Sequence, residues 1–236
     1  MRFSKAVALP LLLVIALGIT GLAYAWWTET LQIDGTVNTG ELKVIFWNDP
    51  TEPTWGPTWR VPNWRGYGTA PYVTRTWSLS SDQKTLTITL GNMYPRTGSQ
   101  RIAFGMRNVG TIPAKLENVT IAIDGSPDLA YYVRTQGKIE YFTSTGTKLW
   151  EKSFGNWPHI DGDLHERDVR LELLGDTLTS LLAGTVLNPG DFLAFGEETE
   201  EGGCLGFALH ATAPDNVELQ SITFSLSFEF VQWNAP

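Results

Sequence analysis

The chain has a single cysteine, Cys204, among its 236 residues. No disulfide can form within one chain, so a disulfide-stapled scaffold is excluded and packing has to hold the fold together. We interpret Cys204 as a small apolar core residue at the start of a strand, with pairing between two chains as the alternative. Charged residues are scarce as well, at 18% of the chain, and acidic residues outnumber basic ones by 25 to 17. An acidic exterior repels phosphates and anionic lipid, so nucleic acid is not an expected partner.

Catalytic motifs are missing too. The chain contains no Gly-x-Ser-x-Gly turn and no phosphate-binding glycine loop. His159 and His165 flank two aspartates in one acidic loop, but this loop lacks the late glutamate of a calcium site, and no second histidine follows at the spacing of a zincin helix. We therefore expect no enzyme, no catalytic residue, no metal and no cofactor. A metallopeptidase that uses His159 and His165 is the less favoured alternative.

The N-terminus has the three parts of a secretory signal peptide. Arg2 and Lys5 precede an uncharged apolar run over residues 6–22, and Ala23-Tyr24-Ala25 follows it. A basic start, an apolar middle and an Ala-x-Ala exit are typical of an export signal that is removed. We predict that residues 1–25 are this signal, that the mature protein is secreted, and that it meets a membrane only before cleavage. A retained anchor is the alternative, although the run is short for a span of ~20 residues. The predicted cleavage site comprises Ala23, Ala25 and Trp26.

Residues 26–40 follow the signal peptide and begin with a strand-like pattern. Trp27, Leu31 and Ile33 alternate with polar residues, so one face is apolar, and Glu29 interrupts that face. A free strand of this kind gains backbone hydrogen bonds and apolar burial when it adds to an open sheet edge. Donated from each copy to the next, it makes a contact that repeats without closing and so yields a filament. The alternative is a strand that folds back into its own sheet. The predicted donor strand comprises Trp26, Trp27, Thr28, Glu29, Thr30, Leu31, Gln32 and Ile33.

Residues 41–236 have the pattern of one β domain with one short helix. Thr85–Leu90 alternates strictly between threonine and apolar residues, and Ser221–Gln232 carries large apolar residues at every second position, which is typical of half-buried strands. Asp176 is the predicted N-cap of the helix and Gly184 its end. These features predict an all-β fold, an antiparallel jelly-roll or Greek-key sandwich. The other predicted strands are Leu42–Trp47, Arg101–Arg107, Leu116–Ile123, Lys138–Phe142, Val169–Leu173, Asp191–Phe195 and Cys204–Ala211.

One long segment, residues 48–76, is rich in proline and aromatic residues and fits no predicted strand. Its aromatic side chains have three open interpretations: a platform that stacks on sugars, anchors for protein contacts, or a cover for a sheet face. A cell-surface carbohydrate-binding module, with glycans as partners, is therefore the alternative function. The candidate aromatic contact surface comprises Trp55, Trp59, Trp64 and Tyr67.

One N-glycosylation sequon is present, at Asn118-Val119-Thr120. Val119, Ile121 and Ile123 indicate that the odd-numbered residues of this strand face inward. We therefore predict that Asn118 points outward and is a glycosylation candidate.

Three motifs and the junction between the signal peptide and the strand carry a resemblance to a known family. The motifs are a strand, turn and strand at Phe104–Leu116, a turn that opens a strand at Leu187–Asp191, and the ending Phe224–Asn234. Together, and in this order, they resemble the TasA/camelysin family of exported proteins. The resemblance implies a jelly-roll subunit that polymerises into extracellular fibres of the biofilm matrix, including the bundling pili of archaea. It also implies that the N-terminal strand of each subunit completes the sheet of its neighbour. The expected partners are copies of the chain in a head-to-tail homopolymer, and neighbouring filaments.

Overall fold

The computed structural model describes residues 14, 17, 40–47, 62–66, 72–95, 99–155, 168–196 and 204–234. The chain divides into two compact units, residues 1–39 and residues 40–236. In the first unit only Val14 and Leu17 are described, and both are helical and exposed. Across the described residues, no helix combines the length and the apolar character that a membrane crossing needs. The account below concerns the second unit.

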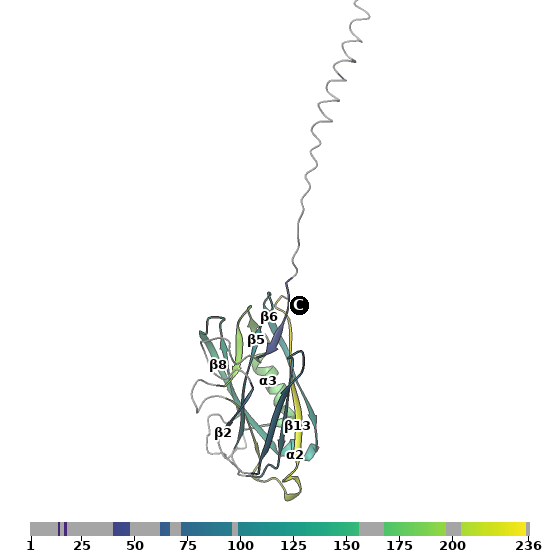
Figure 1. Ribbon diagram of the computed structural model, residues 1–236, viewed down its shortest axis with the longest axis vertical. Helices are drawn as coiled ribbons and strands as arrows, with labels where there is room; N and C mark the ends of the chain where they lie inside the picture. Colours follow the sequence, from purple (N-terminus) through teal and green to yellow (C-terminus); the bar gives the residue numbers. More distant parts are fainter. Residues whose placement is uncertain are drawn as a thin grey trace, which may run out of the picture. The chain divides into compact units, whose positions relative to one another are not determined.

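Two antiparallel sheets form the second unit (Figure 1). In the described residues, sheet A has eight strands in the order β1-β5-β11-β7-β12, with β2 also paired to β5, and with β8 and β9 paired to β7. Its strands are β1 (Val44–Phe46), β2 (Asn63–Gly66), β5 (Gln100–Asn108), β7 (Val133–Phe142), β8 (Lys148–Phe154), β9 (Val169–Arg170), β11 (Phe192–Phe195) and β12 (Leu205–Leu209). Sheet B has five strands in the order β10-β6-β13-β4-β3. Its strands are β3 (Thr74–Leu79), β4 (Thr85–Gly91), β6 (Ala114–Asp124), β10 (Val186–Leu187) and β13 (Ser221–Gln232).

The core lies between the two sheets, where alternate residues of each strand point inward. Sheet B contributes the fully buried Leu86, Ile88 and Leu90 from β4, and sheet A contributes Ile102 and Phe104 from β5. The Phe104 ring stacks on Phe195 with 4.3 Å between the ring centroids. The predicted all-β antiparallel sandwich is therefore confirmed.

The long alternating strands were the most accurately predicted elements. β13 has the predicted bounds, Ser221–Gln232, and β4 extends the predicted Thr85–Leu90 by one residue to Gly91. The predicted strand Val169–Leu173 is wrong after Arg170, because Leu171–Leu173 forms a 3-10 helix, η1, that leads into a helix. Its buried Leu171 satisfies a strand pattern and a helix pattern equally well.

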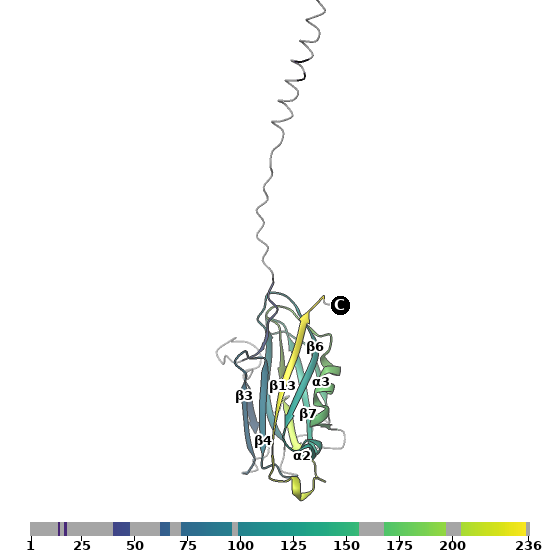
Figure 2. The same cartoon turned by 90° about the vertical axis from the view of Figure 1, so that its right-hand side faces the viewer.

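In the described part of residues 40–236, two α-helices occur, α2 (Pro127–Tyr132) and α3 (Leu174–Leu182). Only α3 was predicted, and its N-cap was wrong. The cap is Leu173 and makes no side-chain hydrogen bond, because η1 runs directly into α3. Asp176 instead lies in the first turn, where its charge favours the helix dipole. Figure 2 shows β3, β4, β13 and β6 side by side, with α3 next to β6.

The expectation that residues 48–76 contain no strand is also wrong. β2 lies inside this segment and pairs with β5, and β3 begins within it at Thr74. Proline blocks only the strand position that it occupies, and β2 pairs on one side only, so Pro62 can stand directly before it. Residues 48–61 and 67–71 lie outside the described residues.

Candidate functional site

Sheet B is incomplete beside the second half of β13. This strand pairs with β6 from Thr223 to Gln232, but it pairs with β4 only from Ser221 to Ser227. The reason is that β4 begins at Thr85, the partner of Ser227. Among the described residues, no strand pairs with Phe228–Gln232 on the β4 side. The backbone donors and acceptors that point to this side are available to a further strand.

The edge strand of sheet A borders the same opening. Lys43 O accepts a hydrogen bond from Val109 N at 2.8 Å, and Trp47 N donates one to Gly105 O at 2.9 Å, so odd-numbered residues here face β5. In an antiparallel ladder the intervening residues point their backbone groups the other way. The N–H and C=O of Val44 therefore point away from β5. Phe46 N points the same way but already donates to Gln83 O at 2.8 Å, so only the Val44 end of β1 offers backbone groups to the opening.

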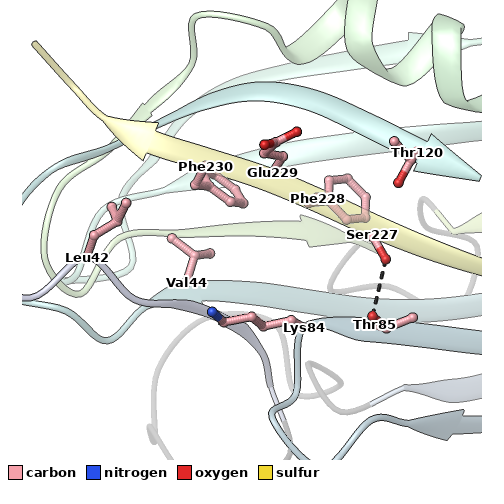
Figure 3. Close-up of a pocket in the computed structure, with 9 residues that line it drawn as sticks. All are labelled: Leu42, Val44, Lys84, Thr85, Thr120, Ser227, Phe228, Glu229 and Phe230. Carbon is pink, nitrogen blue, oxygen red and sulfur yellow. Dashed lines mark hydrogen bonds between the residues drawn. The ribbon is translucent and has the colours of Figure 1, made fainter. Parts of the chain in front are cut away.

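This opening is a groove of about 390 Å³, here called the β13 groove (Figure 3). Its lining residues come from the start of β4, from β6, from the second half of β13 and from the chain around β1. They are Leu42, Val44, Lys84, Thr85, Thr120, Ser227, Phe228, Glu229 and Phe230.

Apolar side chains line the inner part of the β13 groove. Phe228 and Phe230 continue the inward-facing row of β13, but they are only partly buried, whereas Leu226 on the same row is fully buried. The Phe228 ring packs edge-on against Phe46, with the ring centroids 5.8 Å apart. Leu42, on the opposite side, is 37% exposed. A strand placed here would bury these side chains and complete the core.

Polar groups lie along the rim. Thr85 Oγ1 and Ser227 Oγ are joined by a 3.2 Å hydrogen bond on the outer face of sheet B. Lys84 is exposed, and in the described residues its ammonium makes no ion pair. The groove therefore combines apolar walls, free backbone groups and one cation, which suits an extended peptide.

The predicted donor strand, the predicted cleavage residues and the acidic loop with His159 and His165 lie outside the described residues. Trp55, Trp59 and Tyr67 also lie outside them. Within the described residues, no group of three or more His, Cys, Asp or Glu side chains could hold a metal ion.

Trp64 is the described member of the predicted aromatic surface, and it packs against the core. It lies on β2 and is partly buried, and the Arg75 guanidinium sits 5.5 Å from its ring centroid. Its indole Nε1 is buried and has no hydrogen-bond partner among the described residues. Trp64 thus packs against the core, and a contact role for all four aromatic residues stays a prediction.

Asn118 lies on β6 beside α3 and is partly buried. Its side-chain oxygen accepts a hydrogen bond from Thr179 Oγ1 at 3.1 Å. Leu116 and Val119 are both buried despite their different parity, because the pairing with β13 shifts register between Glu229 and Phe230. The simple alternation used to orient Asn118 therefore does not hold along all of β6, and glycosylation stays a prediction.

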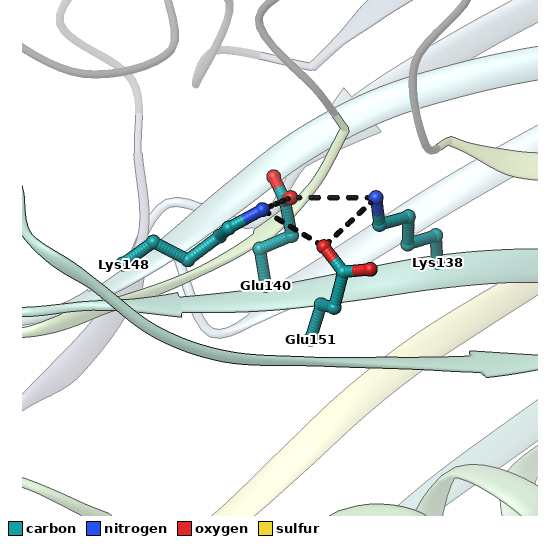
Figure 4. Close-up of polar contacts among 4 residues, drawn as sticks. All are labelled: Lys138, Glu140, Lys148 and Glu151. Atoms are coloured by element: carbon teal, nitrogen blue, oxygen red, sulfur yellow. Dashed lines mark hydrogen bonds and ion pairs between the residues drawn. The ribbon is translucent and has the colours of Figure 1, made fainter.

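A second polar cluster lies on the outer face of sheet A, between β7 and β8 (Figure 4). Glu140 is only 2% exposed, and its Oε1 lies 3.1 Å from Lys148 Nζ and 3.6 Å from Lys138 Nζ. Glu151 Oε2 lies 2.8 Å and 3.0 Å from the same two ammonium groups. Hydrogen bonds to Glu151 and Glu140 raise the pKa of Lys148, and the two lysines lower the pKa of Glu151. Each charge has opposite partners, so this cluster is a structural network.

Sequence reasoning missed the β13 groove, although its signal was present. Ser221–Gln232 carries Phe228 and Phe230 on its apolar face. The neighbouring strand β4 is only about half as long and begins after Lys84. Once these two strands are known to pair, the difference in length predicts an uncovered end.

The described residues thus define an all-β sandwich with one incomplete sheet. No protein-family model matches the chain, and no curated protein matches it. Among solved structures, the chain is similar to one in the "Crystal structure of accessory secretory protein 1,2 and 3 in Streptococcus pneumoniae". The identity is 12%, the match covers 83% of this chain and 100% of the other, and the TM-score is 0.29. A TM-score this low carries no argument about fold or function, and the resemblance to the TasA/camelysin family stays a prediction.

Proposed function

We propose that this protein is the structural subunit of an extracellular filament, assembled by donation of the N-terminal strand of one copy to the next. The observation that supports this proposal is the β13 groove, an open strand position with apolar walls. The predicted donor strand supplies what such a groove lacks, because its sequence alternates as in a strand and has an apolar face of Trp27, Leu31 and Ile33.

The predicted donor strand is long enough to cover the unpaired end of β13. Phe228–Gln232 spans roughly 17 Å at the rise of an antiparallel strand, and the predicted donor strand spans roughly 27 Å. Each large apolar side chain that becomes fully buried contributes about 1.5–3 kcal/mol, and each ladder hydrogen bond adds about 1 kcal/mol. These gains have to exceed the cost of ordering the strand and of joining two subunits.

A head-to-tail contact of this kind leads to a filament. The donor strand and the β13 groove are different surfaces, so the contact is heterologous and repeats with every added copy. A strand that enters the groove of its own chain gives a monomer instead. The experiment therefore has to distinguish filaments from monomers.

The test compares the mature protein, residues 26–236, with a variant that lacks residues 26–33. We expect filaments of the first protein in electron micrographs and only soluble, folded subunits of the second. A synthetic peptide of residues 26–34 should bind the shortened variant, and should bind less well when Leu31 is replaced by Asp. Filaments of normal length from the shortened variant would rule out the proposed function, as would a mature protein that stays monomeric at all concentrations.

A further inference from the structure

We propose that Lys84 sets the register of the incoming strand by pairing its ammonium group with the Glu29 carboxylate of the neighbouring copy. This inference rests on the proposed function and names the contact that makes its assembly specific. It starts from two charged residues that each interrupt an apolar row.

Lys84 is exposed at the mouth of the β13 groove and directly precedes β4. Leu86, Ile88 and Leu90 point into the core, and Lys84 precedes them with the same parity. Figure 3 shows its side chain reaching along the groove toward Val44. Its side chain thus extends the inward-facing row of β4 to the point where an added strand would begin.

Glu29 has the matching place on the donor strand. Trp27, Leu31 and Ile33 share its face, so the face that enters the groove carries one carboxylate among apolar side chains. Removing an unpaired carboxylate from water costs free energy and weakens binding. A cation beside the carboxylate offsets part of this cost. Among the nine residues that line the groove, Lys84 is the only basic one.

Among the described residues, no acidic group forms an ion pair with the Lys84 ammonium, and Asp82 interacts with its charge only at longer range. Glu229 is the only acidic residue of the lining, and it has the opposite parity to the inward-facing Phe228 and Phe230. The Asp82 carboxylate accepts hydrogen bonds from the Ser80 hydroxyl at 2.5 Å and from the Lys84 backbone N–H at 3.2 Å. Glu41 lies 4.0 Å from the ammonium of Lys43.

The pair of Lys84 and Glu29 would disfavour shifted registers that apolar contacts alone permit. A slip by one residue turns Trp27, Leu31 and Ile33 to the wrong face, so the alternation already excludes it. A slip by two residues keeps the apolar face inward but moves Glu29 away from Lys84 and toward Phe228 or Phe230. The charge pair therefore discriminates between registers of equal parity.

Charge reversal on both sides tests the contact. We expect the single variants Lys84→Glu and Glu29→Lys each to raise the subunit concentration needed for filaments about tenfold or more, as for a desolvated charge pair. The double variant Lys84→Glu with Glu29→Lys should recover most of this loss. Lys43→Glu is the matched control, since Lys43 neighbours the groove but does not line it. Far-ultraviolet circular dichroism checks that each variant is folded.

A peptide experiment isolates the contact from polymerisation. The variant that lacks residues 26–33 offers a groove without its own donor strand, and the probes are peptides of residues 26–34 with Glu29 or with Lys at this position. The protein with Lys84 should bind the peptide with Glu29 more tightly. The Lys84→Glu variant should bind the peptide with Lys at this position more tightly. Equal affinities for both peptides, or polymerisation of both single variants at the wild-type concentration, would overturn the register contact while the proposed function stands. If removal of residues 26–33 leaves filaments intact, the proposed function itself fails.

Discussion

At the scale of the residue, Asn108 is a buried side chain whose hydrogen bonds are all used. Its amide nitrogen donates to Ile112 O at 2.8 Å and to Leu187 O at 2.9 Å, and its oxygen accepts from Gly110 N at 2.9 Å. The side chain thus joins the end of β5 to the following turn and to β10. This arrangement gives a physical role to the sequence Asn108-Val109-Gly110, because the Gly110 N–H lies close to the asparagine side chain.

We expect Asn108→Ala to lower the free energy of unfolding by about 3 kcal/mol, because it leaves buried backbone groups without partners. Urea denaturation of the shortened, non-polymerising variant measures the change. Gln232→Ala, at an exposed position, is the control and should change stability by less than about 0.5 kcal/mol. A loss no larger than that of the control would contradict the role given to Asn108.

The lowered pKa of Glu151 leads us to expect that stability depends on pH. Its pKa is lowered from the ordinary value of 4.5 by Lys148 and then by Lys138. A carboxyl group whose pKa is lower in the folded state stabilises the fold above its unfolded pKa, and this contribution is lost as the pH falls through the folded pKa. Between about pH 5 and pH 2 the thermal midpoint of the parent protein should therefore fall more than that of Glu151→Gln. Parallel curves for the two proteins would show that the ion network does not contribute.

At the scale of the element, the outer face of sheet B carries paired hydroxyl groups between β4 and β13. Hydrogen bonds join Thr87 Oγ1 to Ser225 Oγ and Thr89 Oγ1 to Thr223 Oγ1, each at 2.9 Å. These contacts repeat the backbone register of the two strands, since the same residues are opposite one another in the ladder. The pairs thus help to hold the register of the strand that borders the groove.

We expect Thr87→Val to change the free energy of unfolding by less than about 1 kcal/mol, because valine keeps the shape and strand preference while one partly buried hydroxyl pair is lost. Leu86→Ala, one residue away but fully buried, should cost about 2–5 kcal/mol. Similar losses for the two variants would contradict the assignment of inner and outer faces on β4.

The comparison of sequence with structure also belongs to this scale. Leu86, Ile88 and Leu90 predicted β4 because a strand buried on one face repeats every second residue. The start of α3 could not be predicted from Asp176, since η1 supplies the preceding turn and no side-chain cap is used. The alternation along β6 breaks at Glu117, because the register shift in the pairing with β13 depends on both strands. Local patterns therefore predicted strands such as β4 and β13, whereas β2, β3, β8 and α2 were not predicted.

At the scale of the whole molecule, the β13 groove leaves the end of one strand face outside the closed core. Phe224 is fully buried within the sandwich, whereas Phe230 on the same strand face is only partly buried at the groove. The pattern of β13 alone therefore does not predict the candidate site. Both residues have the same apolar pattern, and only the length of β4 distinguishes them.

We therefore expect Phe230→Ser to leave the subunit folded, yet to raise the concentration needed for filaments at least tenfold, since apolar surface is lost mainly from the contact with the donor strand. Sedimentation of filaments against a concentration series measures this effect. Phe224→Ser is the contrasting variant and should unfold the subunit. Normal filament formation by folded Phe230→Ser would exclude the β13 groove as the acceptor.

The half-paired state of β13 also has a consequence for growth. A fibre joined through this groove would use one groove and one N-terminal donor strand, here called the tail, from every subunit. Such a fibre is unbranched and has a direction. One terminal subunit keeps an unfilled groove and the other keeps an unplaced tail, and the two ends then grow at different rates. A subunit without its tail fills no groove itself but still accepts a strand, so a small amount of it would stop elongation at one end alone.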